Sequence, residues 1–325
     1  MRGNWGLIGH EWAVNLLRGR LASQRLGHAY LITGPPSIGK TTLASRLAQA
    51  INCQNPDQAP CGQCRACQLI ERRIHPDLEV LGDDGVNIKI DAIRDLQANL
   101  ARRPFEAPYR IALVLNLHNA SLASADALLK TLEEPPAEVK LILTADNAEL
   151  LLPTIVSRCQ VLPLRPVPLR NIEMALVQEY DIPPDQAVLL ARLSGGRPGW
   201  AISHAQDEDQ MAWRGEVLNS IIDALRSTYT QRFSLAEAIA RDNQRDRILE
   251  LWLSWWRDVV LLANETRVPP VNMDRAADLD EVAYRIDPDD ALIALKAVRR
   301  TTEALGRYAN ARLALEVMML DLPRL

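Results

Sequence analysis

The chain has 325 residues, of which 48% are hydrophobic and 24% are charged, and its formal net charge is -4. These values are typical of an ordinary soluble protein with two or three domains. The small negative charge excludes an overall electrostatic attraction to nucleic acid, although a local basic face remains open.

The first predicted element is an amphipathic helix over residues 8–26, which ends at Gly27. Its apolar stretch is broken by Arg18 and Arg20, so it does not have the pattern of a secretory signal. No apolar run approaches the length needed to cross a membrane. We therefore expect a cytoplasmic protein without membrane contact, in which cysteine thiols stay reduced.

A phosphate-binding loop is predicted between a short strand at residues 29–32 and a second amphipathic helix. Residues 34–41 read GPPSIGKT and fit the pattern G-x-x-x-x-G-K-[ST] in the strand–loop–helix context that a P-loop requires. The glycines allow backbone N–H groups to surround phosphate, and the helix N-terminus adds positive potential. Lys40 is expected to reach the β- and γ-phosphates, and Thr41 to hold Mg²⁺. The predicted nucleotide-binding residues of this segment are Gly34, Pro35, Pro36, Ser37, Ile38, Gly39, Lys40, Thr41 and Thr42.

Four of the five cysteines follow within fifteen residues: Cys53, Cys61, Cys64 and Cys67. Four thiolates at this spacing suit a tetrahedral zinc ion, and they leave no open coordination position, so the expected zinc is structural. The alternatives are a set of structural thiols and a C-x-x-C redox pair, which needs only two cysteines. His75 is near enough to be a substitute ligand, but His75-Pro76-Asp77 is better interpreted as a turn into the next strand.

Strands and helices then alternate as far as residue 164. The predicted strands are residues 78–81, 111–117, 139–144 and 160–164, and the predicted helices are residues 92–102, capped by Asp91, and 124–132. Asp83-Asp84-Gly85 reads as a turn. Near-continuous apolar strands that alternate with helices predict a parallel sheet buried on both faces.

The rest of the chain is predicted to be helical after a linker at residues 165–168. Short helices are expected at residues 169–180, 184–193 and 198–205, a helix at 248–262, and a long periodic pattern at 288–320. Trp252, Trp255 and Trp256 lie among Leu and Val at helical spacing. This spacing favours a helical core or a subunit interface over a base-binding site.

The strand at residues 111–117 ends without a carboxylate. A P-loop ATPase needs an acidic residue at the tip of a neighbouring strand, to hold the Mg²⁺ shell and to activate water. Asp126, Glu133 and Glu134 lie within or at the far end of the following helix, where we do not expect them to reach the strand tip. The chain is therefore expected to hold ATP but to hydrolyse it poorly by itself.

Several segments together resemble one family, the bacterial clamp-loader subunits of DNA polymerase III, of the delta-prime and tau/gamma types. The segments are HAYLITGPPSIGKTTLA, CGQCRACQLI, HPDLEV, ALLKTLEEPPAEVKLILTADN and LLPTIVSRCQ. The resemblance implies an α/β P-loop domain of the AAA+ class with a parallel five-stranded sheet, a small helical lid and an all-α collar. It implies domain boundaries at residues 1–165, with the zinc module at 53–67, then 166–207 and 208–325.

The resemblance also implies roles for two further residues. Ser157-Arg158-Cys159 matches the family motif whose arginine reaches the neighbouring subunit's ATP site, so Arg158 is implied to be catalytic in trans. Thr144 is implied to be the polar sensor of the nucleotide site at the end of the fourth strand. The residues alone favour a plainer interpretation of Arg158, in which it satisfies carbonyls at a helix end and pairs with a nearby acid.

Two departures from the family pattern favour the delta-prime type. Leu115 and Asn116 stand where the tau/gamma type has Asp-Glu, and Gly199 stands where the lid has an arginine. Arg197 is out of register and is not assigned the arginine's role. The other types of function that stay open are an active tau/gamma-like ATPase and a nucleotide-free assembly scaffold.

The implied partners are the tau/gamma and delta subunits of a five-subunit ring, and the sliding clamp and primed DNA through that complex. The implied cofactors are structural Zn²⁺ and ATP with Mg²⁺.

Overall fold

The computed structural model describes residues 3–82, 87–307 and 309–325, so the turn predicted at residues 83–85 lies outside the described residues. The chain divides into two compact units. One runs as far as Asp181 and includes Gly196–Ala201, and the other comprises Ile182–Gly195 and Ile202–Leu325.

A five-stranded parallel sheet forms the centre of the first unit, with strand order β2-β3-β4-β1-β5. The strands are β1 (Ala29–Thr33), β2 (Leu78–Leu81), β3 (Arg110–Val114), β4 (Val139–Ala145) and β5 (Gln160–Pro163). Because β1 lies between β4 and β5, the tip of β4 adjoins the loop that follows β1. In this pairing Thr33 lies opposite Ala145.

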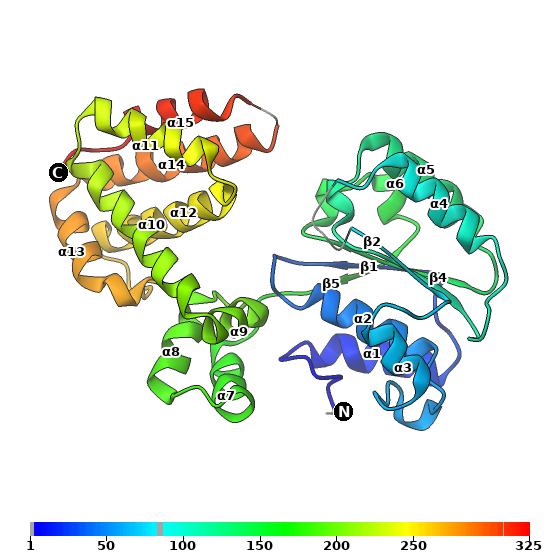
Figure 1. Ribbon diagram of the computed structural model, residues 1–325. Helices are drawn as coiled ribbons and strands as arrows, with labels where there is room; N and C mark the ends of the chain where they lie inside the picture. The colour runs from blue at the N-terminus through cyan, green and yellow to red at the C-terminus, as the bar shows by residue number, and fades with distance from the viewer. Residues whose placement is uncertain (1–2, 83–86, 308) are drawn as a thin grey trace. The chain divides into compact units, whose positions relative to one another are not determined.

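Helices cover both faces of this sheet (Figure 1). One face carries α1 (Glu11–Ala22), α2 (Lys40–Ile51) and α3 (Arg65–Glu71), and the other carries α4 (Ile90–Leu100), α5 (Leu122–Glu133) and α6 (Pro153–Val156). Every residue of β1, β3 and β4 is buried, as expected for a parallel sheet between two helical layers. The predicted α/β domain with a five-stranded parallel sheet is confirmed.

Several boundaries in this unit differ from the prediction. α1 runs only from Glu11 to Ala22, not over residues 8–26, because His10 adopts a positive φ of 62° before it and Ser23 ends it. β3 ends at Val114, earlier than expected, because Asn116 adopts a positive φ of 52° and turns the chain into a short 3-10 helix, η2 (Leu117–Asn119). α4 begins at Ile90 with Lys89 as its N-cap, so Asp91 lies in the first turn and does not cap the helix.

The second unit is all-helical. The helices from residue 169 onward are α7 (Leu169–Tyr180), which belongs to the first unit, α8 (Pro184–Leu193), α9 (Pro198–Gln206), α10 (Glu208–Arg226), α11 (Tyr229–Arg241), α12 (Arg245–Ala263), α13 (Ala276–Arg285), α14 (Pro288–Leu305) and α15 (Ala311–Leu320). The periodic pattern at 288–320 is therefore two helices. α14 ends at Leu305, and the side chain of Asn310 caps α15 by accepting from the N–H of Leu313 at 3.1 Å.

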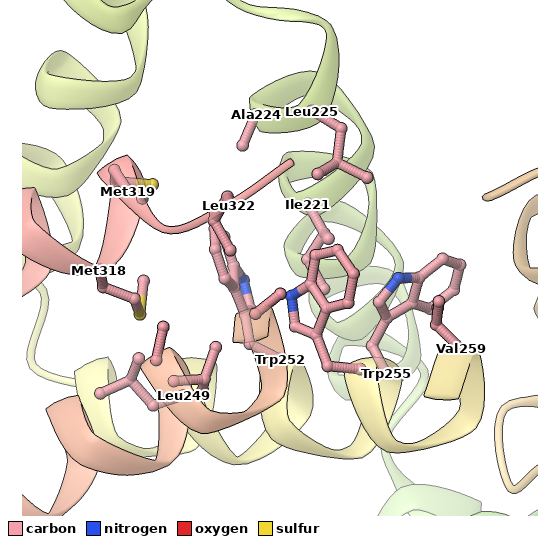
Figure 2. Close-up of a cluster of buried hydrophobic side chains, with 14 of the residues drawn as sticks. Ile221, Ala224, Leu225, Leu249, Trp252, Trp255, Val259, Met318, Met319 and Leu322 are labelled. Carbon is pink, nitrogen blue, oxygen red and sulfur yellow. The ribbon is translucent and has the colours of Figure 1, made fainter. Parts of the chain in front are cut away.

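The three tryptophans of α12 form the middle of the hydrophobic core of this unit. Trp252, Trp255 and Trp256 are fully buried. Figure 2 shows Trp252 and Trp255 packed among apolar side chains of other helices and of the C-terminal segment, including Ile221, Leu225, Met318, Met319 and Leu322. The prediction of a helical core is confirmed. Within the described residues, no helix has both the length and the apolar character needed to span a membrane.

Candidate nucleotide and metal sites

The loop after β1 has the backbone geometry of a phosphate-binding loop. Gly34 and Gly39 adopt φ angles of 147° and 109°, and a Cβ at Gly34 would lie 2.6 Å from the carbonyl oxygen of Leu164. In the described part of the chain, the backbone N–H groups of residues 37–41 have no acceptor. α2 begins at Lys40, so its N-terminus adds positive potential at the same place. The loop can therefore bind phosphate.

The side chain of Lys40 has three partners within the protein. Its Nζ donates to the carbonyl oxygens of Gly34 (2.7 Å) and Pro35 (2.9 Å), and it pairs with Asp146 Oδ1 at 2.8 Å. Lys40 is 6% exposed. Ile38 is buried, Thr41 is half-buried, and Pro36, Ser37 and Thr42 are exposed.

Asp146, which the sequence analysis did not consider, lies at the phosphate loop and contacts Lys40. β3 carries Asn116 just beyond its tip, but the sheet order places β4, and not β3, directly beside β1. Asp146 follows β4 and lies opposite Gly34, and the N–H of Gly34 donates to the Asp146 carbonyl at 3.1 Å. The available signal was the run Thr144-Ala145-Asp146 at the end of a predicted strand.

Thr144 lies at the end of β4, as expected, but its hydroxyl has a structural partner. The side chain is fully buried, and Oγ1 accepts from the backbone N–H of Asn116 at 2.9 Å. This bond fixes the turn after β3 against β4.

Gly199, which stands at the position implied for a lid arginine, lies against the P-loop. Its N–H donates to the Ser37 carbonyl at 2.9 Å, and a Cβ at Gly199 would lie 2.9 Å from that same oxygen. A side chain at this position would require a shift of backbone. Arg197 lies two residues earlier in the same segment of the first unit.

The four predicted zinc ligands come together in the segment after α2 and the first turn of α3. The Sγ atoms of Cys53, Cys61, Cys64 and Cys67 all lie within 4.8 Å of one another. Zinc–thiolate bonds of about 2.3 Å in a tetrahedron place the sulfurs roughly 3.8 Å apart, so the donor set fits zinc. His75 is not part of this cluster.

Backbone N–H groups donate to three of the four sulfurs in the cluster. The N–H of Cys61 donates to Cys53 Sγ (3.4 Å), that of Cys64 to Cys61 Sγ (3.3 Å), and that of Cys67 to Cys64 Sγ (3.5 Å). The bond from Cys64 is the main reason that the pKa of the Cys61 thiol falls to about 6. Burial raises the pKa of the Cys67 thiol, so a bound cation would be needed to hold all four as thiolates.

His75 belongs to a turn, as the sequence predicted. Its Nδ1 accepts from the Asp77 N–H at 3.0 Å, and its Nε2 lies 3.6 Å from Glu106 Oε1. The turn leads into β2 and fixes the neighbouring loop through the buried carboxylate of Asp77.

Arg158 follows α6 and contacts a helix-end carbonyl and a nearby acid, which is the interpretation that the residues alone favoured. Its Nη2 forms an ion pair with Glu133 Oε1 at 2.7 Å, and its Nη1 donates to the Thr154 carbonyl at 2.9 Å. The side chain is still 35% exposed, so part of the guanidinium stays at the surface of the first unit. Cys159 lies outside the metal cluster, and burial raises the pKa of its thiol to about 12.

Two family models match the chain. Residues 9–168 match the model described as DNA polymerase III, delta subunit, and residues 208–323 match the model described as DNA polymerase III, delta subunit, C terminal.

Individual relatives agree with these models. The chain is 35% identical to DNA polymerase III subunit delta' of Bacillus subtilis over 181 residues, which are 56% of this chain and 55% of that protein. It is 33% identical to subunit tau of Escherichia coli over 253 residues, which are 75% of this chain and 39% of that protein. The chain thus spans about half or less of the length of these relatives.

Solved structures with a related arrangement are more distant. A gamma subunit-related protein from Thermotoga maritima is 16% identical, with a TM-score of 0.40 over 94% of this chain and 97% of that chain. The Thermotoga maritima RuvB Holliday junction branch migration motor is 16% identical, with a TM-score of 0.45 over 93% of this chain and 83% of that chain.

Proposed function

This chain belongs to the clamp-loader family of DNA polymerase III subunits, and from that premise we propose that it is a delta-prime-type subunit. The observation that carries the proposal is the tip of β3. Residues 114–119, which read VLNLHN, contain no carboxylate, so Mg²⁺ and attacking water lack the acids expected there. The close contact between Gly199 and Ser37 supports the same assignment, because it leaves no room for an arginine.

In this role the chain binds ATP with Mg²⁺ but hydrolyses it poorly. The P-loop backbone, Lys40 and Thr41 hold the nucleotide, and the four-cysteine cluster holds structural zinc. The partners are tau/gamma-type and delta-type subunits in a five-membered cytoplasmic ring, which loads the sliding clamp onto primed DNA.

The chain's catalytic contribution is Arg158, which acts on ATP bound by a neighbouring subunit. An arginine supplied in trans stabilises the charge of the transferring phosphoryl group and can raise the rate by about 10³ or more at the site that it serves. The exposed part of the Arg158 side chain and its position in the Ser-Arg-Cys motif support this role.

The test is Arg158→Ala in the reconstituted loader. We expect the steady-state ATPase rate to fall severalfold or more, while gel filtration shows an unchanged complex. Arg25→Ala, which removes another exposed arginine of the same unit, should leave the rate unchanged. Equal ATPase rates for wild type and Arg158→Ala would remove the role in trans.

A further inference from the structure

We propose that Asp146 sets the affinity of this P-loop for nucleotide, because its carboxylate holds Lys40 and competes with phosphate for it. The inference rests on the proposed binding of ATP at this loop, and it adds a specific acid to that site.

The sheet register places Asp146 at the loop. Thr33 and Ala145 are the last paired residues of β1 and β4, so Gly34 and Asp146 are the next residues on adjacent strands. The 3.1 Å bond from the Gly34 N–H to the Asp146 carbonyl extends this pairing by one step. The backbone of Asp146 is therefore fixed to the first residue of the P-loop.

The contacts of Lys40 use its whole donor capacity. An ammonium group has three N–H donors. Here the acceptors are the carbonyls of Gly34 and Pro35 and the carboxylate of Asp146, at 2.7, 2.9 and 2.8 Å. A phosphate oxygen that binds Lys40 must displace one of the three, and Asp146 is the charged one.

His118 supports Asp146 from a second direction. The Asp146 N–H donates to His118 Nδ1 at 3.4 Å, which assigns the proton of the neutral ring to Nε2. His118 Nε2 lies 3.6 Å from Asp146 Oδ2. The carboxylate is therefore held between Lys40 and His118, and it is 32% exposed.

The charge of Asp146 opposes phosphate as well as occupying Lys40. A phosphate that reaches Lys40 lies within a few ångströms of this carboxylate, and like charges at that distance in a partly exposed site repel appreciably. Asp146→Asn removes the charge and keeps the shape. We expect it to tighten ATP binding about tenfold, which corresponds to a differential interaction of about 1.4 kcal/mol.

The experiment measures ATP affinity by titration calorimetry on the full chain, with and without Mg²⁺. Asp146→Asn and Asp146→Ala should both bind ATP about tenfold more tightly than wild type. Glu149→Gln is the matched control, because Glu149 is an exposed acid of the same loop whose side chain lies 3.4 Å from Asn147 Nδ2 and does not contact Lys40. Adding Lys40→Ala to Asp146→Asn should abolish the expected increase in ATP affinity.

Each contrary result is specific. If both Asp146 variants bind ATP with the wild-type affinity, this inference is overturned and the proposed ATP binding stands. If Asp146→Asn binds ATP more weakly than wild type, and does so only when Mg²⁺ is present, the inference is overturned, because Asp146 is then a metal ligand. If neither wild type nor any variant binds ATP, both this inference and the proposed ATP binding are overturned. If the Asp146 variants bind ATP and wild type does not, the inference is supported.

Discussion

Asp77 is a fully buried carboxylate that the surrounding loop keeps ionised. Burial by itself raises the pKa of this group. The N–H groups of Glu106, Phe105 and Ala107 oppose that effect at 2.9, 2.5 and 2.9 Å, and so does the Arg110 guanidinium at 3.3 Å. The net result is a pKa lowered from 3.8. Because the residue ties β2 and β3 to the loop at 105–107, its charge contributes to the stability of the first unit.

We predict that Asp77→Asn lowers the free energy of unfolding at pH 7 by about 3 kcal/mol, since it leaves the buried Arg110 unpaired. A carboxyl whose pKa is lowered in the folded protein stabilises the fold at pH values above its unfolded pKa of 3.8. This stabilisation disappears as the pH falls through the lower pKa of the folded state. The difference between wild type and variant should therefore shrink below pH 3.8. Urea unfolding at a series of pH values measures it.

Asp91→Asn is the control for this prediction. Its carboxylate is 82% exposed and pairs with Arg94 at 3.4 Å on the same helix. Such surface pairs contribute less than about 1 kcal/mol. If both substitutions lower the free energy of unfolding equally, then burial and the loop N–H groups do not make Asp77 more important for stability than the exposed Asp91.

At the scale of an element, the cysteine segment between α2 and α3 has little regular structure of its own. It contains one 3-10 turn, η1 (Pro56–Gln58), and is otherwise irregular. Cys64 is both a member of the cluster and the N-cap of α3, where its Sγ accepts from the Cys67 N–H. A metal here would join the segment to α3 with no need for a hydrophobic core of its own.

We predict about one zinc ion per purified chain, and loss of that zinc in Cys64→Ser when a competing chelator is present. Serine keeps the N-cap oxygen but is a poor zinc ligand, so the substitution separates capping from metal binding. Plasma mass spectrometry measures the zinc. In thermal melting, Cys64→Ser should lose stability at a lower chelator concentration than wild type. Cys159→Ser, outside the cluster, should keep the metal. Zinc-free wild-type protein would contradict the assignment.

At the scale of the whole chain, the all-helical unit is held together by a buried cation as well as by its tryptophan core. Arg232 is fully buried in α11. Its guanidinium donates to the carbonyls of Ala224 (2.7 Å), Met319 (3.1 Å), Leu322 (2.7 Å) and Pro323 (2.6 Å). These are the last carbonyls of α10 and α15 and of the segment beyond, where a positive charge is favourable.

We predict that Arg232→Met lowers the free energy of unfolding by about 3 kcal/mol, because it leaves these buried carbonyls without a donor. Arg232→Lys should recover only part of the loss, since an ammonium lacks the planar fork that reaches several carbonyls. Chemical unfolding followed by tryptophan fluorescence measures both. Arg241→Met, at an exposed helix position, should change stability little. A stability equal to wild type in Arg232→Met would disprove the proposed structural role.

Much of the fold was predictable because its signals are local. The P-loop, the alternation of strands with helices and the four-cysteine spacing each depend on residues close in sequence, and each lies where the pattern predicted. The tryptophans of α12 were assigned to a core for the same reason, since helical spacing puts them on one face. Element ends were less predictable. The break between α14 and α15 depends on a cap at Asn310 within an unbroken apolar pattern.

The amino-acid sequence by itself determined the P-loop motif, the spacing of the four cysteines that cluster, and the family. Only the tertiary structure decided how these parts are paired with remote residues. Lys40 and Asp146 are 106 positions apart, and only the strand order β3-β4-β1 makes the tip of β4, and not that of β3, the neighbour of the P-loop. The tertiary structure likewise decided the ion pair of Arg158 with Glu133 and the hydrogen bond from the Gly199 N–H to the Ser37 carbonyl. Such contacts depend on the packing of strands and helices, which periodicity along the chain does not encode.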